Sequence, residues 1–512
     1  MDNLIGKDRI HYLDEVYTNS FTREFSVESI VKDAQPDIGE ILATDTSVLL
    51  RNKEAEDGRV SVGGVIRAVV LYTPEAAFGI RKIEMEIPFS VAEDDPAISH
   101  DSRVMALVSV FSSDAKTVNP RKIVFRAELC FAVNCFDMRE AQISPSLESG
   151  AAPEVEILTE SKTASMTTDV CEKTFVVSEN FSLPDLTPED ILSMYASVTC
   201  NETSIVGSRL LIKGTAVLRV LYADTQEQGS IQKAEYSTAF SQVVDMETAG
   251  DKTSCDVSIM VTGAYFNHED TLSAASTVIM MELHAVCQCT ARQSFEINYI
   301  SDVYSPKYAC SAENEKTTLS DYCGETKITE TLRETVKTAS PPKKVVRCEI
   351  CLSPVTLTAM KDTIELKTMA NVTVIYVTEN GRTLCASRKY PVTSNMKPEA
   401  GKKYVASASV GGDVLASPVT EGVDVRAPIV FTVMTYKLCE INAVKNVNVD
   451  KSAARDMSKI PSLYIHRVTE GDSLWALAKK YYSTRDLIAK TNDIELTDQP
   501  EPSAILIIPK KR

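Results

Sequence analysis

One strand-like segment recurs three times along this chain of 512 residues. Each occurrence begins with a small residue and ends with a tyrosine eight positions later: Gly64…Tyr72, Gly214…Tyr222 and Thr368…Tyr376. The three tyrosines lie 150 and 154 residues apart. A period of this length exceeds the unit of any solenoid, so it indicates tandem duplication of a whole domain.

Other matches occur in the same order around this segment. Phe25 and Phe175 are 150 residues apart, and Ile41 and Ile191 each precede their tyrosine by 31 residues. Downstream, Phe125–Leu129 aligns with Ile279–Leu283 and with Val425–Ile429. Several ordered matches at similar offsets are hard to obtain by chance, and they support three copies of which the third is the most divergent.

The repeated unit reads as β-structure. Short segments alternate apolar and polar positions and are rich in β-branched residues, a pattern typical of strands. Asn380-Gly381 between two such runs predicts a hairpin, because both residues tolerate positive φ. We therefore expect a mainly β protein with three tandem β-sandwich-like domains. The expected domains span residues 1–150, 151–315 and 316–450, with linkers at Pro145–Pro153, Ser311–Gly324 and Asp450–Pro461.

Charge and hydropathy narrow the function classes. A net charge of −17 argues against a general nucleic-acid binder, which needs a basic face to displace phosphate counterions. No run approaches the roughly 20 apolar residues of a membrane span. The first residues also lack the apolar core of a signal peptide. The expectation is a cytosolic protein that reaches any membrane or wall through a partner.

The 13 cysteines read as reduced core residues of a cytosolic chain. His284, Cys287 and Cys289 are close in sequence, but a strand would turn both thiols toward one face and His284 toward the other. Cys348 and Cys351 have Cys-x-x-Cys spacing, but no second pair lies at zinc-ribbon spacing, and their odd separation puts them on opposite faces of a strand. We therefore predict no metal and no cofactor.

The last fifty residues differ from the rest of the chain. Two strand-like runs, Tyr464–Val468 and Ile505–Pro509, enclose two short helical runs. Asp472 or Ser473 can cap the first helix, and Ser483 or Thr484 the second. The first helix then carries an apolar face made of Leu474, Leu477, Ala478 and Tyr481.

This βααβ module, residues 462–512, resembles a LysM domain, a small α+β module known mainly for binding N-acetylglucosamine-containing glycans. The resemblance implies a shallow groove between the turn after the first strand and the loop after the second helix. The corresponding positions are Gly471, Asp472, Ser473, Leu474, Trp475, Asn492, Asp493 and Ile494.

Three of these positions also have a purely structural interpretation. Trp475, the one tryptophan of the chain, is either a binding anchor or a core residue. Gly471 suits a turn, and Asn492 suits a helix C-cap. The module departs from the LysM pattern at Ser503, where the family usually has glycine, and its last loop is acidic, with Glu495, Asp498 and Glu501. Such a loop could face a basic protein partner instead of a sugar.

Catalytic motifs do not occur in the sequence. It contains no Walker loop, no His-Glu-x-x-His and no Gly-x-Ser-x-Gly. We predict a protein that is not an enzyme. A wall hydrolase remains an alternative, because a glycosidase needs only two carboxylates.

A triplicated β-domain followed by a LysM module resembles the SipL-type proteins of clostridial spore formers, whose repeated unit is called the SPOCS domain. Pro36-Asp37-Ile38, echoed by Pro184-Asp185-Leu186, and the Gly64…Tyr72 segment carry this resemblance. It implies a spore coat assembly scaffold in the mother cell, recruited to the forespore surface by docking of its LysM domain onto the basal coat ATPase, with other coat proteins as further partners. The alternative is a protein that binds peptidoglycan and targets the cortex or wall.

Overall fold

The computed structural model describes residues 5–76, 79–147, 155–184, 186–223, 230–246, 250, 253–270, 276–496 and 500–511. Asp185, Asp498 and residues 148–153 of the first predicted linker lie outside these ranges. Within them, no helix is both long enough and apolar enough to cross a membrane.

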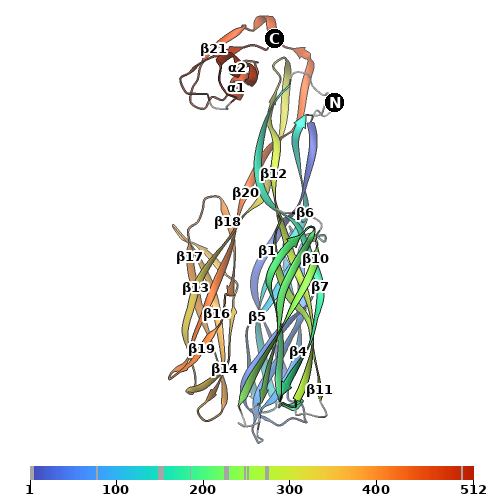
Figure 1. The fold of residues 1–512 in the computed structure, drawn as a ribbon, viewed down its shortest axis with the longest axis vertical. Helices are drawn as coiled ribbons and strands as arrows, with labels where there is room; N and C mark the ends of the chain where they lie inside the picture. Colours follow the sequence, from blue (N-terminus) through green and yellow to red (C-terminus); the bar gives the residue numbers. More distant parts are fainter. Residues whose placement is uncertain are drawn as a thin grey trace.

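The described chain is built almost entirely from antiparallel strands (Figure 1). The first copy contains β1 (Ile5–Ile30), β2 (Ile38–Glu56), β3 (Arg59–Pro74), β4 (Arg81–Asp94), β5 (Arg103–Asn119) and β6 (Lys122–Leu147). The second contains β7 (Glu156–Pro184), a 3₁₀ turn η1 (Pro188–Asp190), β8 (Ile191–Val206), β9 (Arg209–Ala223), β10 (Ile231–Asp245), β11 (Thr253–Asp270) and β12 (Ser276–Tyr304).

The third copy contains β13 (Tyr308–Lys337), β14 (Pro342–Leu352), β15 (Thr356–Ala359), β16 (Ile364–Thr378), β17 (Thr383–Met396), β18 (Lys402–Val410), β19 (Leu415–Val419) and β20 (Gly422–Ala454). After the turn η2 (Met457–Lys459), the terminal module consists of β21 (Leu463–Arg467), α1 (Leu474–Lys480), α2 (Arg485–Asn492) and β22 (Ile505–Pro509). The predicted fold class, three β-sandwich-like units followed by a βααβ module, is confirmed. The predicted boundaries at residues 150, 315 and 450 stay predictions.

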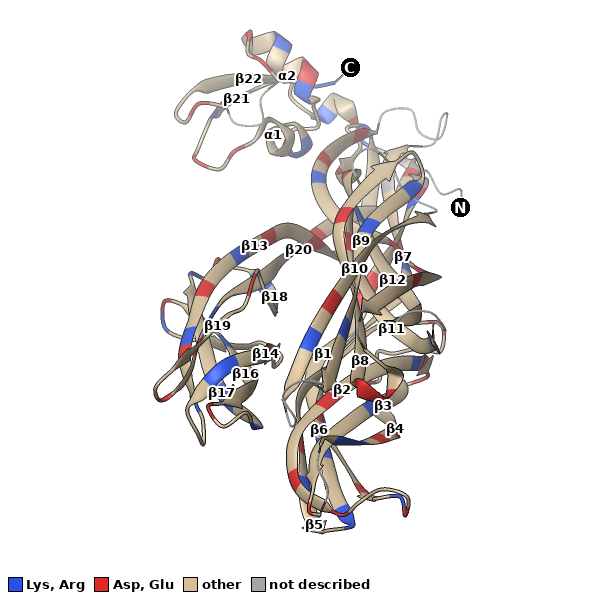
Figure 2. Ribbon diagram, turned by 60° about the horizontal axis from the view of Figure 1, so that its bottom comes forward, with Lys and Arg blue, Asp and Glu red and all other residues tan. Residues whose placement is uncertain are grey.

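In each copy a small sheet packs against a pair of much longer strands. In the first copy, β2-β3-β4 covers β1, β6 and β5, and the core between them includes Ile66, Val70, Phe125 and Leu129. Copies one and two share one six-stranded sheet, β11-β12-β7-β1-β6-β5, which joins them through Leu13 opposite Thr167. Basic and acidic residues are interspersed along the strands (Figure 2).

The first and last strands of each copy extend beyond the sandwiches as two-stranded ribbons, visible in the upper part of Figure 1. We call the region where these ribbons meet the stalk. It is held together by apolar side chains from all three ribbons: Ala141, Ile143, Ala164, Met166, Ile297, Tyr299, Leu319, Cys439, Ile441 and Ala443.

The predicted linker Ser311–Gly324 is wrong, because these residues belong to β13 and pair with β20. The segment is polar because most of its side chains are exposed on the ribbon, and polarity alone does not distinguish an exposed ribbon from a linker.

The three copies meet around a separate apolar cluster, which we call the junction. Six of its members come from positions that the repeat makes equivalent: Leu42, Leu192 and Val346 from β2, β8 and β14, and Leu71, Leu221 and Ile375 from β3, β9 and β16. All six are at most 4% exposed. The offsets of 150 and 154 residues seen in the sequence therefore recur as a threefold-like packing of the copies.

Polar contacts add to the junction. The Arg347 guanidinium of copy three lies 3.0 Å from the Asp45 carboxylate of copy one, which also accepts a hydrogen bond from the Ser193 hydroxyl of copy two. Away from the junction, the Gln288 side chain of copy two donates to the carbonyl of Ala106 in copy one at 2.8 Å and accepts from its amide at 3.0 Å. Gln288 thus replaces the neighbouring strand that the edge strand β5 lacks on this side.

The recurrent glycine has a steric cause. Gly64 lies opposite Phe89, and Gly214 lies opposite Phe240, each on the adjacent strand. A Cβ at Gly64 would lie 2.7 Å from the Phe89 ring and would overlap the carbonyl oxygen of Leu49. The glycine therefore leaves room for an aromatic ring above the strand.

The third copy lacks both the glycine and the aromatic residue opposite it. Thr368 stands where the first two copies have glycine, and its partner across the strands is Val392 instead of phenylalanine. The Thr368 hydroxyl donates to the Ser353 carbonyl at 2.7 Å, at the break between β14 and β15. Threonine fits there because both the ring and the continuous neighbouring strand are missing.

Strand pairing corrects one detail of the predicted alignment. Phe25 is paired with Ala127, and Phe175, its equivalent, is paired with Ala285. Phe125 therefore corresponds to Leu283, four residues beyond the predicted match. An alternating apolar pattern has a period of two, so the sequence alone allows shifts by even numbers of residues.

The predicted arrangement of the central cysteines is confirmed. Cys287 and Cys289 are fully buried on one face of β12, together with Leu283 and Ala285. His284 lies on the other face beside Glu282, 2.6 Å from its carboxylate.

We expect Gly64→Ala to destabilise the protein by about 1–3 kcal/mol, because the added methyl group must displace the Phe89 ring or the neighbouring strand. Gly64→Ala combined with Phe89→Val should lose less than the sum of the single changes, with a coupling of about 0.5–3 kcal/mol. Urea unfolding followed by circular dichroism measures these losses. Strictly additive losses would contradict the proposed coupling.

Candidate functional site

The terminal module folds as its local sequence predicts. Ser473 caps α1 by accepting a hydrogen bond from the Ala476 amide at 3.1 Å, and Thr484 caps α2 by accepting from the Leu487 amide at 3.2 Å. Leu474, Leu477, Ala478 and Ile488 are at most 1% exposed, and they pack on Leu506 and Ile508 of β22. The predicted caps and the predicted apolar helix face are both confirmed.

The first predicted groove segment is a braced turn. Asp472 accepts hydrogen bonds from the Thr469 amide and hydroxyl, both at 2.8 Å, and lies 2.9 Å from the His466 ring nitrogen Nε2. The contact with His466, followed by those from Thr469, lowers the pKa of Asp472 to about 2. Gly471 is exposed with φ of +94°, a conformation that favours glycine. Asp472 thus shapes the turn, and Gly471 is open to solvent.

The second predicted groove segment holds α2 against β22. The Asn492 side chain donates to the Ile488 and Ile507 carbonyls and accepts from the Ile507 amide, all within 2.8 Å. Asp493, and not Asn492, is the C-cap residue, with φ of +52°. Ile494 follows as an exposed apolar side chain. The groove assignment itself stays a prediction for all eight residues.

Trp475 does not face solvent but docks the module onto the stalk. Its indole nitrogen donates to the Asp302 carboxylate at 2.8 Å, and its ring meets Tyr304 edge-on at 4.8 Å between centroids. Both partners lie at the end of β12, in the second copy. The side chain is 6% exposed, so its surface is almost entirely used within the chain.

Further contacts complete this docking. Lys479 lies 2.7 Å from both carboxylate oxygens of Asp302, and the Tyr304 hydroxyl donates to the Ser483 carbonyl at 2.8 Å. Burial by itself would raise the pKa of Asp302. The hydrogen bonds from Lys479 and Trp475 have the larger effect, so the pKa of this carboxyl is lowered. Sequence reasoning missed Asp302 and Tyr304, because they lie more than 170 residues from their partners.

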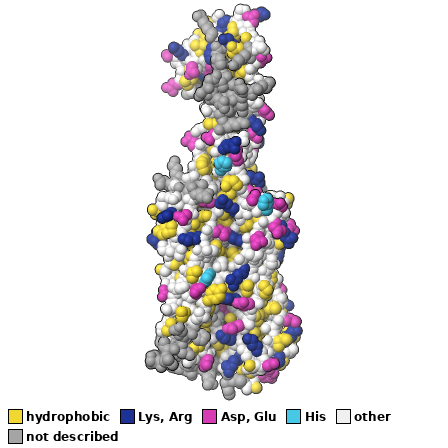
Figure 3. Space-filling view, turned by 90° about the vertical axis from the view of Figure 1, so that its right-hand side faces the viewer, with side chains coloured by type: hydrophobic (Ala, Val, Ile, Leu, Met, Phe, Trp, Pro, Cys, Tyr) yellow, Lys and Arg dark blue, Asp and Glu magenta, His cyan; other side chains and the backbone are white. Residues whose placement is uncertain are grey.

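The outer face of the module's two-stranded sheet is apolar and exposed. Side chains alternate along a strand, so those not packed on the helices point outward. They are Leu463, Ile465, Ile505 and Ile507, exposed by 57%, 79%, 68% and 41%. Ile465 and Ile507 are direct partners across the strands. We call these four residues the outer face; hydrophobic side chains are visible on the module in the space-filling view (Figure 3).

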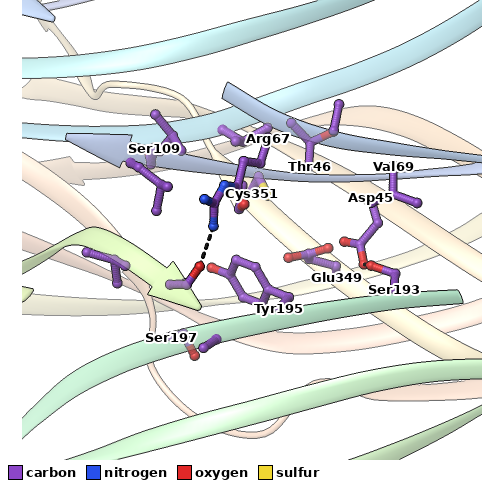
Figure 4. Close-up of a pocket in the computed structure, with 18 of the residues that line it drawn as sticks. Asp45, Thr46, Arg67, Val69, Ser109, Ser193, Tyr195, Ser197, Glu349 and Cys351 are labelled. Carbon is purple, nitrogen blue, oxygen red and sulfur yellow. Dashed lines mark hydrogen bonds between the residues drawn. The ribbon is translucent and has the colours of Figure 1, made fainter. Parts of the chain in front are cut away.

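A cavity of about 790 Å³ lies where the three copies meet. Repeat-equivalent positions line it from each copy. One set is Asp45, Tyr195 and Glu349 (Figure 4), and another is Ser47, Ser197 and Cys351. Burial raises the pKa of Tyr195 to about 12, and Glu349 adds to the effect. The Arg67 guanidinium donates to the Ala264 carbonyl across the cavity. This hydrogen bond connects copies one and two. The sequence could not reveal the cavity, because the cavity depends on how the copies pack.

Comparison with known families identifies two kinds of domain in this chain. The family described as SipL, SPOCS domain matches residues 37–129 and 188–268, within the first and second copies. The LysM domain family matches residues 466–509, the terminal module. Both are non-catalytic binding or scaffold domains. Neither a curated protein nor a solved structure matches the chain.

We expect Asp302→Ala to release the module from the stalk at a cost of about 1–3 kcal/mol, because it leaves the buried indole donor without a partner. Trp475 is the single tryptophan, so its fluorescence reports this contact directly. Its emission should shift to longer wavelength, and acrylamide should quench it more strongly. Asp302→Asn, which keeps an acceptor but loses the charge, should give an intermediate result.

Glu296→Gln is the matched control, since Glu296 lies on the same strand and bonds to Ser161 instead of the module. Acid titration provides a second readout. The pKa of Asp302 is lowered in the folded state. The ionised carboxylate therefore contributes fully to the stability of the docked module above the ordinary carboxyl pKa, and this contribution is lost as pH falls through the lowered pKa. Unchanged emission in Asp302→Ala would show that the docking does not depend on this carboxylate.

Proposed function

We propose that this chain, which carries SPOCS domains of the SipL family and a C-terminal LysM domain, is a non-enzymatic scaffold of the spore coat. In this proposal, the LysM domain docks onto the basal coat ATPase at the forespore surface. The domain content supports a sporulation-related protein whose LysM module is of the peptidoglycan-binding type. The coat ATPase, the mother-cell location and recruitment to the forespore are the finer steps of the proposal.

The outer face of the LysM domain carries this proposal. Four neighbouring aliphatic side chains exposed by 41–79% form an apolar patch, and contiguous patches of this kind mark protein interfaces more often than plain surface. Aliphatic side chains also fit the core of a protein interface better than a sugar, which is bound mainly through aromatic stacking and hydrogen bonds. The exposed Ile494, Glu495 and Leu496 add apolar and acidic surface to the same small domain.

Docking of Trp475 on the stalk supports the same assignment. With its indole bound to Asp302, the LysM domain keeps one orientation relative to the β-domains. A partner bound at the outer face would then be held at a defined distance and angle from the three β-copies. This geometry suits a scaffold, whose other surfaces can bind further coat proteins.

The alternative function is binding of peptidoglycan, with the protein targeted to the cortex or wall. The observation in its favour is the open turn at Gly471, which is exposed and where an added Cβ would meet no neighbouring atom within 4 Å. Sedimentation of the full chain with purified peptidoglycan discriminates the two functions. Strong pelleting that N-acetylglucosamine oligomers reverse would favour the glycan. Release of reducing ends would instead indicate a hydrolase.

We expect Ile465→Asp or Ile505→Asp to weaken binding to the purified coat ATPase at least tenfold, about 1.4 kcal/mol, because a carboxylate would be buried at the core of the interface. Binding of the full chain to immobilised ATPase measures the loss. Met360→Asp is the matched control, since Met360 is 52% exposed on the third copy.

Trp475 fluorescence should be unchanged in both outer-face variants, which shows that the LysM domain stays folded and docked. Undiminished binding by Ile465→Asp and Ile505→Asp would exclude the outer face. Loss of binding in Asp302→Ala alone would instead make the orientation of the domain the decisive feature.

A further inference from the structure

Five of the 13 cysteines gather in the core of the second copy. They are Cys171 on β7, Cys200 on β8, Cys255 on β11, and Cys287 and Cys289 on β12. The sulfur atoms of Cys287 and Cys289 are 3.4 Å apart. All five are free thiols. Neither the proposed scaffold role nor the LysM domain uses this cluster.

Within the cluster, Cys171 and Cys289 are direct partners across two antiparallel strands. Residues in such positions have Cα atoms about 4.5–5.5 Å apart, which lies within the range that a disulfide spans. Cys287 and Cys289 are two positions apart on one strand. Cα atoms at this separation are about 6.8 Å apart, at the upper limit of that range. The pairing therefore favours Cys171 as the partner of Cys289.

The other copies use this position differently. Four residues before the Phe25–Ala127 pair, the first copy has Phe21 opposite Phe131, with stacked rings 5.2 Å apart. The same step from Phe175–Ala285 leads to Cys171 and Cys289. In the third copy, the pair four residues before Leu332–Ala427 is Ile328 and Phe431. Bulky apolar pairs fill this level in two copies, and only the second copy has two thiols there.

The two thiols differ in access and in acidity. Cys171 is partly exposed, whereas Cys289 is fully buried. Interaction with the neighbouring Cys289 thiol lowers the pKa of Cys171 despite its partial burial. Interaction with the Cys171 and Cys287 thiols, together with burial, raises the pKa of Cys289. Cys171 is therefore the thiol that an oxidant reaches first, with Cys289 beside it.

We propose that Cys171 and Cys289 are an oxidation site that forms a cross-strand disulfide with a hydroperoxide as oxidant. The Cys171 thiolate attacks the peroxide and is oxidised to a sulfenic acid, while the peroxide is reduced and leaves as water or an alcohol. The Cys289 thiol then attacks the sulfenic sulfur and forms the S–S bond. Its proton leaves with the hydroxyl group as water.

The disulfide would covalently join β7 to β12. These two strands continue from the core of the second copy into the stalk, and β12 ends at the residues that hold the LysM domain. A bond between positions 171 and 289 closes a loop of 119 residues, the two cysteines included, so it would mainly restrict the unfolded chain. The oxidised protein should resist thermal unfolding better than the reduced one.

The test uses the full chain with Cys323→Ser and Cys385→Ser, which removes the two exposed cysteines. After dilute hydrogen peroxide, remaining thiols are alkylated and the protein is analysed by mass spectrometry without reduction. We expect loss of two hydrogen atoms and two thiols, and a linkage between tryptic peptides 163–173 and 253–292. Dithiothreitol should reverse both changes and lower the melting temperature to that of the reduced protein.

Cysteine variants identify the bond within the second peptide. Cys171→Ser and Cys289→Ser should abolish it, while Cys200→Ser, Cys255→Ser and Cys287→Ser should retain it. Circular dichroism shows which variants fold. If Cys171→Ser does not fold, the linkage in the parent protein identifies Cys171, the one cysteine of peptide 163–173. If Cys289→Ser does not fold, a bond retained in both Cys255→Ser and Cys287→Ser assigns it to Cys289. Uptake of oxygen without a linked peptide, or a bond that survives Cys289→Ser, would overturn the proposal.

Discussion

The packing of the three β-copies at the junction is the constraint on which the rest of this structure depends. Leu42, Leu192 and Val346 come from equivalent positions of the repeat and are buried against one another. Complete burial of such a side chain contributes roughly 1.5–3 kcal/mol, so the junction as a whole is a substantial part of the stability. The contact of Asp45 with Ser193 and Arg347 adds a polar connection among all three copies at the same place.

Contacts between the copies also protect the edges of the sheets. A sandwich with open edge strands exposes unpaired backbone groups, which invite aggregation. Here side chains from neighbouring copies bond to those groups, as Gln288 does at Ala106 and Asn371 at the carbonyl of Phe111. Asn371 and Arg67 occupy equivalent positions in the repeat, and both bond to a carbonyl of an adjacent copy. The three copies thus act as covers for one another.

The stalk positions the LysM domain relative to the three packed copies. Its ribbons leave the sandwiches as continuations of the first and last strands, so their direction follows from the packing below. At its end, Asp302 and Tyr304 hold Trp475, while Lys511 of the module pairs with Glu156 at the start of β7 at 2.8 Å. A tryptophan that the sequence allowed to be either a ligand anchor or a core residue is here the contact between two domains.

Local and periodic features were determined by the sequence itself. The triplication, the β class and the buried face of Cys287 and Cys289 follow from spacing and alternation, and each is confirmed. The sequence also narrowed each helix cap to two adjacent residues, of which the structure uses Ser473 and Thr484. Only the tertiary structure decided four other features. They are the strand in place of the predicted linker Ser311–Gly324, the alignment of Phe125 with Leu283 instead of Ile279, the cavity, and the role of Asp302. Polarity does not distinguish a ribbon from a linker, a period of two does not set the register, and contacts between residues far apart in the chain leave no local pattern.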